Sequence, residues 1–182
     1  MSPHVAFVGA GAMGSYVGAH VARTGIDVTL IDPWAEHIDA IKQHGVAYTG
    51  TGGADIVRVN ALHIHEVKTL TRRPVDVAFM CVKSYDTEWA TMLIRQYLAP
   101  GGFVVSLQNC INEERIAGVV GWGRTVGCIA STIGVDVQRP GHVERNYKPG
   151  GDAYTVFRVG EIHGRVTERV KSVAKIVGKF VL

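Results

Sequence analysis

The chain has few cysteines and little excess charge of either sign, and both shortages exclude classes of protein. Its 182 residues include three cysteines and no Cys-x-x-Cys pair, so neither a disulfide framework nor a cysteine-based zinc site is expected. Nineteen Lys and Arg residues oppose 16 Asp and Glu residues, for a formal net charge of +3. Because the basic residues are scattered, no nucleic-acid-binding surface is predicted. The sparse cysteines indicate a reduced, cytoplasmic protein.

Long apolar runs that could cross a membrane or direct secretion are also missing. An uncharged stretch covers residues 5 to 22, but glycines at positions 9, 11, 14 and 18 interrupt it. No basic cluster precedes the stretch, and no secretory cleavage site follows it. Neither a signal peptide nor a membrane span is therefore expected. The stretch is better explained as a buried strand, a glycine turn and a helix.

Glycine, in contrast, is abundant, and its 22 residues punctuate alternating strand and helix patterns. This alternation predicts an α/β fold with a Rossmann-type, doubly wound and mainly parallel sheet, formed by residues 1–182 as one domain. Strands are predicted at residues 4–8, 27–31, 75–82, 103–107, 125–137, 143–145 and 154–159, with a hairpin at 46–60 and turns at 100–102 and 140–141. Helices are predicted at residues 12–24, 33–44, 86–98, 112–120 and 165–182.

The first predicted strand runs directly into a glycine loop, Gly9-Ala10-Gly11-Ala12-Met13-Gly14, which opens the first predicted helix. A G-x-G-x-x-G pattern in this context is typical of dinucleotide-binding domains. The first glycine permits the tight turn, the second lets backbone N–H groups approach a pyrophosphate, and the third lets the helix pack closely on the strand. These six residues are therefore the predicted phosphate-binding loop. The alternative is that the glycines serve packing alone.

Asp32 ends the second predicted strand, 23 residues after Gly9. In NAD-binding domains a carboxylate at this place binds the hydroxyls of the adenosine ribose, and it would repel the 2′-phosphate of NADP. No arginine follows it directly. Asp32 therefore favours NAD over NADP. Its alternative role is to cap the next helix.

Two more polar residues follow predicted strands, at the edge where such sheets bind ligands. Lys83 comes after the strand at 75–82 and could reach the cofactor or a substrate carboxylate, or simply be solvated. Asn109 comes after the strand at 103–107 and could bind a substrate hydroxyl or the nicotinamide ribose, or act as a turn residue. Cys81 is interpreted as a buried apolar residue rather than a nucleophile.

His63 and His65 are two residues apart, so on a strand their side chains would share one face. A metal site would need further ligands that the sequence does not place, and an exposed face is the preferred interpretation. No metal site is predicted.

Together these motifs resemble the N-terminal domain of the ketopantoate reductase (2-dehydropantoate 2-reductase) family. The resemblance rests on the opening Val-Gly-Ala-Gly-Ala-Met-Gly-Ser, on Cys-Val-Lys-Ser at 81–84, on Leu-Gln-Asn at 107–109, and on a segment that ends in Arg-Pro-Gly-His-Val at 139–143. Gly160-Glu161 is similar to the end of the family's last strand. The features occur in the family's order through nearly the whole chain.

The resemblance implies reduction of a 2-keto acid with NADPH, at the junction of a Rossmann domain and a C-terminal helical domain. It implies that residues 9–14 bind the pyrophosphate and that Lys83 contacts the cofactor. It further implies that Asn109 touches both the nicotinamide end and the substrate, and that Val135 makes a backbone contact with the cofactor.

Three features depart from the family pattern. Asp32 stands near the place where members that use NADPH carry an arginine, and Cys110 replaces the glycine that usually follows the asparagine. The family's proton-donating lysine and a substrate-binding glutamate lie in the helical domain, which we expect to be absent from this chain. Residues 178–182 resemble a cut rather than a natural terminus. We therefore expect the 182 residues alone to bind dinucleotide and to be inactive.

The leading hypothesis is the NADP- or NAD-binding portion of a 2-keto acid reductase, with 2-dehydropantoate as substrate and a role in pantothenate biosynthesis. One alternative is a D-2-hydroxyacid dehydrogenase on the same scaffold, which Asp32 and Cys110 favour. Another is a non-catalytic dinucleotide-binding module. The expected partner is a small 2-keto acid, with no nucleic acid and no membrane, and the apolar face of residues 166–182 could form a homodimer.

Overall fold

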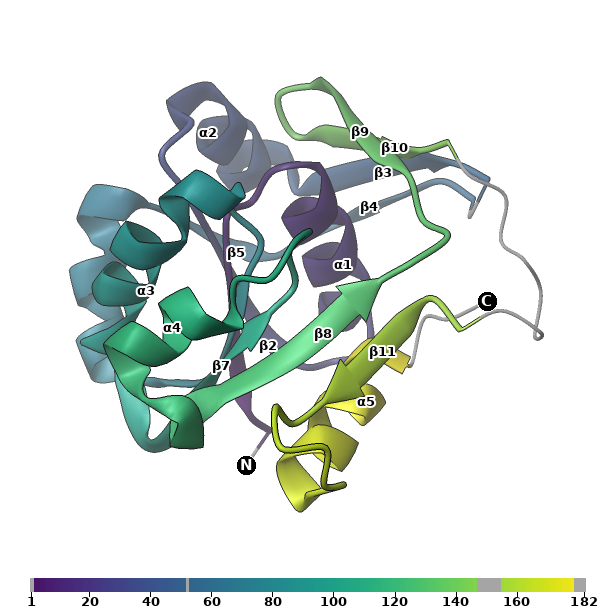
Figure 1. The fold of residues 1–182 in the computed structure, drawn as a ribbon. Coiled ribbons are helices and arrows are strands. Elements are labelled where there is room, and N and C mark those ends of the chain that lie inside the picture. The colour runs from purple at the N-terminus through teal and green to yellow at the C-terminus, as the bar shows by residue number, and fades with distance from the viewer. Residues whose placement is uncertain (1, 52, 147–154, 179–182) are drawn as a thin grey trace.

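A seven-stranded sheet forms the centre of the computed structural model, which describes residues 2–51, 53–146 and 155–178 (Figure 1). The strand order is β11-β8-β7-β6-β1-β2-β5, and every neighbouring pair is parallel except β11 and β8. The strands are β1 (His4–Val8), β2 (Asp27–Asp32), β5 (Asn60–His63), β6 (Val75–Met80), β7 (Leu98–Ser106), β8 (Thr125–Ala130) and β11 (Phe157–Gly160).

The direction of winding reverses at β1. The chain builds outward from β1 to β2 and β5, and then crosses to the other side of β1 to form β6, β7 and β8. This is the predicted α/β, Rossmann-type, doubly wound sheet. The two halves diverge between β1 and β6, and a crevice opens beyond the carboxyl ends of these strands, where folds of this class bind ligands.

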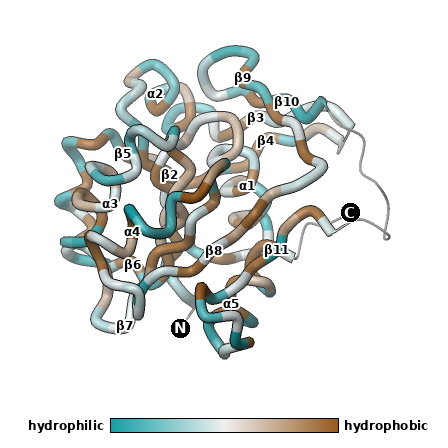
Figure 2. Tube along the Cα trace, in the orientation of Figure 1, coloured by the Kyte–Doolittle hydropathy of each residue, from teal (hydrophilic) through white to brown (hydrophobic). Residues whose placement is uncertain are grey.

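Helices cover both faces of the central sheet (Figure 1). One face packs against α1 (Ala12–Arg23), α2 (Ala35–His44) and α5 (Glu168–Gly178), and the other against α3 (Thr87–Arg95), α4 (Glu113–Val120) and the 3-10 helix η1 (Ile64–Arg72). Short 3-10 turns η2 (Ser84–Asp86) and η3 (Trp122–Arg124) precede α3 and β8. Hydrophobic residues run through the strands between these layers (Figure 2). None of the helices in the described ranges is long and apolar enough to cross a bilayer.

A second sheet of four strands lies over the outer side of α1 (Figure 1). Its order is β4-β3-β10-β9, with β3 (Val46–Gly50), β4 (Asp55–Val57), β9 (Val135–Arg139) and β10 (His142–Arg145). The hairpin predicted at 46–60 supplies β3 and β4, and its last residue, Asn60, begins β5 of the central sheet. The single strand predicted at 125–137 is wrong, because the chain leaves the central sheet after β8 and enters the small sheet as β9.

Other predicted boundaries move by a few residues. The expected turn at 100–102 lies inside β7, whose register against β6 shifts there. The turn at 140–141 is confirmed between β9 and β10. The predicted start of the last strand, at residue 154, lies outside the described residues. The last helix begins at Glu168, three residues later than predicted.

The apolar face of α5 is already used within the chain. Val170, Val173 and Val177 are buried in the main core, whereas Val166 precedes the helix and is exposed. Arg169 ties the helix to the end of β11, since its Nη2 lies 2.5 Å from Oε2 of the buried Glu161. The part of this face that the structure describes is therefore covered by the protein's own sheet and would not supply a homodimer contact.

Glycines let α1 approach its neighbours more closely than any other residue would. A Cβ on Gly14 would lie 2.0 Å from the Gly9 carbonyl oxygen, and one on Gly18 would lie 2.5 Å from the Leu30 side chain. The small sheet closes on the opposite side of α1, where Tyr16 meets Tyr48 edge-on with ring centroids 5.9 Å apart. α1 is thus enclosed between two sheets, and the position of its first turn is fixed from both sides.

The interface between α1 and the small sheet encloses His20, whose ring lies 4.4 Å from that of Tyr16 and 4.5 Å from that of Tyr48. Burial, together with the positive charges of the nearby Arg23 and Arg145, lowers the pKa of His20 from 6.5 to about 4, against the opposing charge of Asp55. Between these two values the unfolded chain binds a proton at this position that the folded chain excludes. Stability should therefore fall as the pH decreases from about 6.5 toward 4.

Replacing His20 by Phe should remove this contribution to the pH dependence. We expect the free energy of unfolding of the native chain to fall between pH 6.5 and 4.5 by about 2 kcal/mol more than that of His20→Phe. Urea denaturation followed by circular dichroism at both pH values measures the difference, which is independent of any constant packing effect of the substitution. Equal pH slopes for the two proteins would contradict the prediction.

Candidate functional site

The glycine loop lies at the sheet edge where β1 meets α1, and two neighbouring strands hold it in place. Gly9 has φ +97°, and the Gly9 and Ala10 amides both donate to the Ile31 carbonyl, at 2.9 and 3.2 Å. A Cβ on Gly9 would lie 2.6 Å from the backbone nitrogen of Val82, whereas one on Gly11 would meet nothing within 4 Å. The loop is therefore packed tightly at Gly9 and open at Gly11, beside the positive end of α1.

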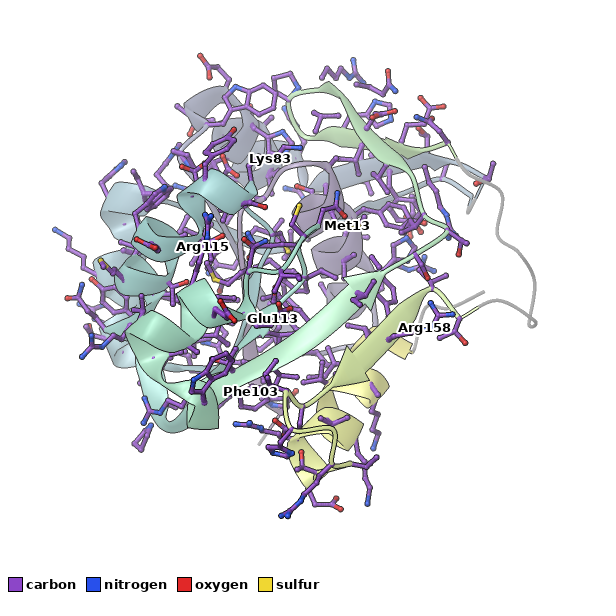
Figure 3. The ribbon with its side chains drawn as sticks, in the orientation of Figure 1. Met13, Lys83, Phe103, Glu113, Arg115 and Arg158 are labelled. Atoms are coloured by element: carbon purple, nitrogen blue, oxygen red, sulfur yellow. The ribbon has the colours of Figure 1, made fainter. Side chains whose placement is uncertain are left out.

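A cleft of about 490 Å³ lies at this edge of the sheet. Its walls come from five segments of the chain, and Met13 at the start of α1 and Lys83 after β6 are marked in Figure 3. The lining residues are Gly11, Ala12, Met13, Cys81, Val82, Lys83, Ser84, Leu107, Gln108, Asn109, Ala130, Ile133, Gly134, Val135, Asp136 and Asn146.

Most of the predicted site residues meet at this cleft. Residues 11–13, Lys83, Asn109 and Val135 all line it, although they come from segments up to about 120 residues apart. Gly9 and Gly14, the two ends of the loop, pack against neighbouring backbone, and Asp32 ends the neighbouring strand β2. The roles assigned to these residues in ligand binding stay predictions.

The loops that carry Lys83 and Asn109 are joined by two amide side chains, one buried and one half-buried. Asn112 is almost completely buried, and its Nδ2 donates to the Asn109 carbonyl at 2.8 Å and to Ser84 Oγ at 3.1 Å. Gln108 Nε2 donates to the Val82 carbonyl at 2.8 Å. The ends of β6 and β7 are thereby fixed relative to each other, at the position where Lys83 and Asn109 reach the cleft.

The sequence assigned no role to Asn112 or to Gln108, although Gln108 lies within the Leu-Gln-Asn motif at 107–109. Both follow a strongly apolar strand that ends at the ligand edge, and for Asn112 this position is the signal that could have drawn attention to it. Which partner an amide side chain reaches depends on the neighbouring strand, and the sequence alone does not show it.

The thiols near the cleft differ in exposure. Burial raises the pKa of the Cys81 thiol, and it raises that of Cys128 to about 12, so neither is suited to act as a thiolate. Cys110 is exposed, next to Asn109, and has φ +70°. A side chain at this backbone angle is strained, so the glycine expected here by resemblance would be accommodated more easily.

Of the two roles that the sequence left open for Asp32, the structure bears only on capping, and ribose binding stays a prediction. Its Oδ1 accepts the Trp34 amide at 2.9 Å, at the residue that precedes α2, so it caps the approach to the helix rather than its first turn. Burial raises the pKa of the Asp32 carboxyl group, whereas hydrogen bonds from the backbone amides of Trp34 and Ala10 lower it. Because Ala10 belongs to the glycine loop, the Asp32 carboxylate lies directly beside that loop.

The expectation that His63 and His65 share one strand face is wrong. β5 ends at His63, and His65 belongs to η1, with the two rings stacked at a centroid distance of 5.3 Å. His63 Nε2 lies 2.9 Å from Asp39 Oδ1. Within the described ranges, no three His, Cys, Asp or Glu side chains gather closely enough to hold a metal ion.

The arrangement fits a dinucleotide. Gly11 leaves open space at the start of α1, where backbone N–H groups and the helix dipole favour phosphate. The strands on either side of β1 each add a charged group: the Asp32 carboxylate ends β2, and the Lys83 ammonium group follows β6. Residues 9–14, Asp32 and Lys83 would hold such a ligand, and Asn109 and Val135 would lie along the same cleft.

Comparisons with known proteins point to one family. The family model described as "Ketopantoate reductase PanE/ApbA" matches residues 5–157. The 2-dehydropantoate 2-reductase of Archaeoglobus fulgidus is 32% identical over 176 residues, which cover 95% of this chain and 52% of that protein. The chain therefore spans about half the length of this curated relative.

Solved structures give the same result for the fold. The 2-dehydropantoate 2-reductase of Geobacter metallireducens superposes with a TM-score of 0.81 at 26% identity, over 97% of this chain and 55% of that one. D-mandelate dehydrogenase with NADH and anilino(oxo)acetate superposes with a TM-score of 0.79 at 24% identity, over 97% of this chain and 54% of that one.

Asn112 offers a direct test of how the cleft is held together. In Asn112→Asp a carboxylate replaces the amide donor and faces the Asn109 carbonyl, so we expect the free energy of unfolding to fall by about 2 kcal/mol. Asn60→Asp is the matched control, because Asn60 is exposed and its side-chain amide donates a hydrogen bond to Thr29 Oγ1. This substitution should lower the free energy of unfolding by less than about 1 kcal/mol. Urea denaturation measures both, and an equal loss in the two variants would contradict the prediction.

Proposed function

This chain belongs to the ketopantoate reductase PanE/ApbA family, and from that membership we propose that residues 1–182 form the NAD(P)-binding domain of an oxidoreductase that reduces 2-dehydropantoate to pantoate. One observation carries the proposal: the glycine loop, Lys83, Asn109 and Val135 converge on a single cleft at the point where the sheet reverses its winding. Because the chain spans half the length of its relatives, the reduction itself is proposed for the whole enzyme.

Each side chain at the cleft would have a separate task. Lys83 is exposed and cationic, so it would bind a phosphate of the cofactor or the carboxylate of the substrate. The Asn109 amide would donate a hydrogen bond to the keto oxygen and orient it. When bound, the nicotinamide would supply the hydride for C2 of the 2-keto acid. The proton for the resulting alkoxide would come from the lysine of the family's helical domain.

We propose NAD as the preferred cofactor. Asp32 presents a carboxylate beside the glycine loop, and the following residues, Pro33 to Glu36, include no arginine to neutralise a 2′-phosphate. Two hydroxyls of the adenosine ribose could be accepted there, whereas a phosphate would be repelled.

A D-2-hydroxyacid dehydrogenase is the second candidate, favoured by the same Asp32 and by Cys110 in place of the family's glycine. A non-catalytic dinucleotide-binding module is the third. Rates with NADH and NADPH on 2-dehydropantoate and on other branched 2-keto acids, measured on a full-length form, separate the first two. Tight dinucleotide binding without turnover of any 2-keto acid by that form would favour the third.

Cellular location and assembly follow as further proposals. The free thiols of Cys81, Cys110 and Cys128 fit a reducing compartment, so we propose that the protein is cytoplasmic. A homodimer stays a prediction, although the described part of the α5 face would not form its interface, and sedimentation of the purified chain tests it.

Dinucleotide titrations test the proposed function. We expect NADH to bind the 182-residue chain at least about tenfold more tightly than NADPH, and Asp32→Ala to remove most of this difference by weakening NADH binding. Asp39→Ala, which removes the same charge from α2, should leave the ratio unchanged. Fluorescence titration gives the Kd values, and the same samples should not turn over 2-dehydropantoate. Failure of the unmutated chain to bind either dinucleotide would contradict the proposal.

A further inference from the structure

A buried chain of hydrogen bonds reaches the glycine loop from behind. Ser15 Oγ donates to the Ala10 carbonyl at 2.6 Å, His37 Nε2 lies 3.1 Å from Ser15 Oγ, and the Gly141 amide donates to His37 Nδ1 at 3.1 Å. Ser15 and His37 are completely buried. The four members of this relay come from the β9–β10 turn, α2, α1 and the glycine loop, so it links segments that are far apart in the sequence.

The protons in this relay have one consistent arrangement. Because the Gly141 amide must donate, His37 Nδ1 carries no proton, and the neutral ring therefore carries its proton on Nε2. Nε2–H then donates to Ser15 Oγ, which leaves the hydroxyl proton of Ser15 for the Ala10 carbonyl. Burial lowers the pKa of His37, against the opposing charge of Asp32 and a backbone hydrogen bond with Ala10, and this direction favours the neutral ring that the Gly141 contact requires.

Holding the Ala10 carbonyl inward has a consequence for the next amide. The carbonyl oxygen of Ala10 and the N–H of Gly11 belong to the same planar, trans peptide unit, so they point to opposite sides. With the oxygen held toward Ser15, the Gly11 N–H faces away from the relay, and Gly11 lines the cleft. The relay thus determines the direction of a phosphate-binding donor.

We propose that His37 is a positioning residue for the pyrophosphate of the dinucleotide, acting through Ser15 and the Ala10 carbonyl to aim the Gly11 amide into the cleft. The inference rests on the proposed function for its ligand and goes beyond it in assigning a role to His37 and Ser15. The relay also connects the two walls of the cleft, because the Gly141 turn follows β9, whose first residue, Val135, lines the opposite side.

The surroundings of His37 support this role. Trp34 stacks on the imidazole with ring centroids 4.9 Å apart and an interplanar angle of 16°, which prevents the ring from turning. Asp32 is the charged group whose field reaches the ring from the end of β2.

The variants His37→Gln and His37→Asn test the two ring nitrogens of the imidazole separately. The side-chain amide of Gln can replace Nε2–H as the donor to Ser15, whereas the shorter Asn can replace Nδ1 as the acceptor for Gly141 but cannot reach Ser15. We expect His37→Asn and Ser15→Ala each to weaken binding of NADH and ADP about tenfold, a cost of about 1.4 kcal/mol. His37→Gln should stay within about threefold of the native chain, less than 1 kcal/mol.

Further measurements distinguish positioning from a general loss of structure. Adenosine, which has no pyrophosphate, should bind all variants about equally, and the double variant Ser15→Ala/His37→Asn should be no weaker than Ser15→Ala alone. His44→Asn, an exposed histidine on the same helix, is the matched control and should leave ADP binding unchanged. The ¹⁵N spectrum of His37 in the ligand-free chain should show a bare Nδ1 and a protonated Nε2.

Each outcome bears on one of the two proposals. If the unmutated chain binds neither NADH nor ADP, the proposed function fails, while the ¹⁵N tautomer still tests the relay. If the unmutated chain binds but Ser15→Ala binds equally well, or His37→Gln loses as much affinity as His37→Asn, the positioning role is overturned. A protonated Nδ1 in the neutral ring would overturn it as well.

Discussion

The close approach of α1 to the strands beneath it is the constraint on which the rest of the structure depends. A Cβ on Gly14 would overlap the Gly9 carbonyl, and a Cβ on Gly9 would overlap the backbone after β6. Because no other side chain fits at these two positions, the helix can begin directly above β1. Its free amides therefore face the crevice between β1 and β6, and the cleft takes its shape from a packing requirement in the backbone.

The parts of the fold set by local chemistry could be predicted from the sequence. β1 and β2 are short apolar runs with glycine or a charged residue at their ends, and they agree with prediction to within one residue. Lys83 and Asn109 were found because each follows a strand whose carboxyl end must lie at the ligand edge. The predicted strand at 125–137 failed because Thr132 and Ile133 continue the β-branched pattern between β8 and β9, and Gly134 is the one residue there that marks the change of sheet.

The relay behind the loop and the amides beneath the cleft could not be predicted, for a different reason. Ser15 lies in a helix of small residues, and His37 and Asn112 stand among other polar residues, with no motif that sets them apart. Their roles depend on hydrogen-bond partners that are distant along the chain. Ser15 and His37 are 22 residues apart, His37 and Gly141 are 104 apart, and Asn112 and Ser84 are 28 apart. Burial of such groups is tolerable only when those partners are in place, so they report tertiary structure and not local propensity.

The small sheet has a consequence for how the chain reaches its native state. β3 and β10 pair in parallel although more than 90 residues separate them, and α1 is covered on its outer side only after both have formed. During synthesis the first half of the chain would therefore expose Tyr16, His20 and Tyr48 until residues 135–145 have emerged. Pairing of β3 with β10 closes a loop formed by the chain between them. Closing a loop of this length is slow and costs entropy before any contact forms. The glycine loop and its helix should consequently become rigid late, in the same step that docks the β9–β10 hairpin.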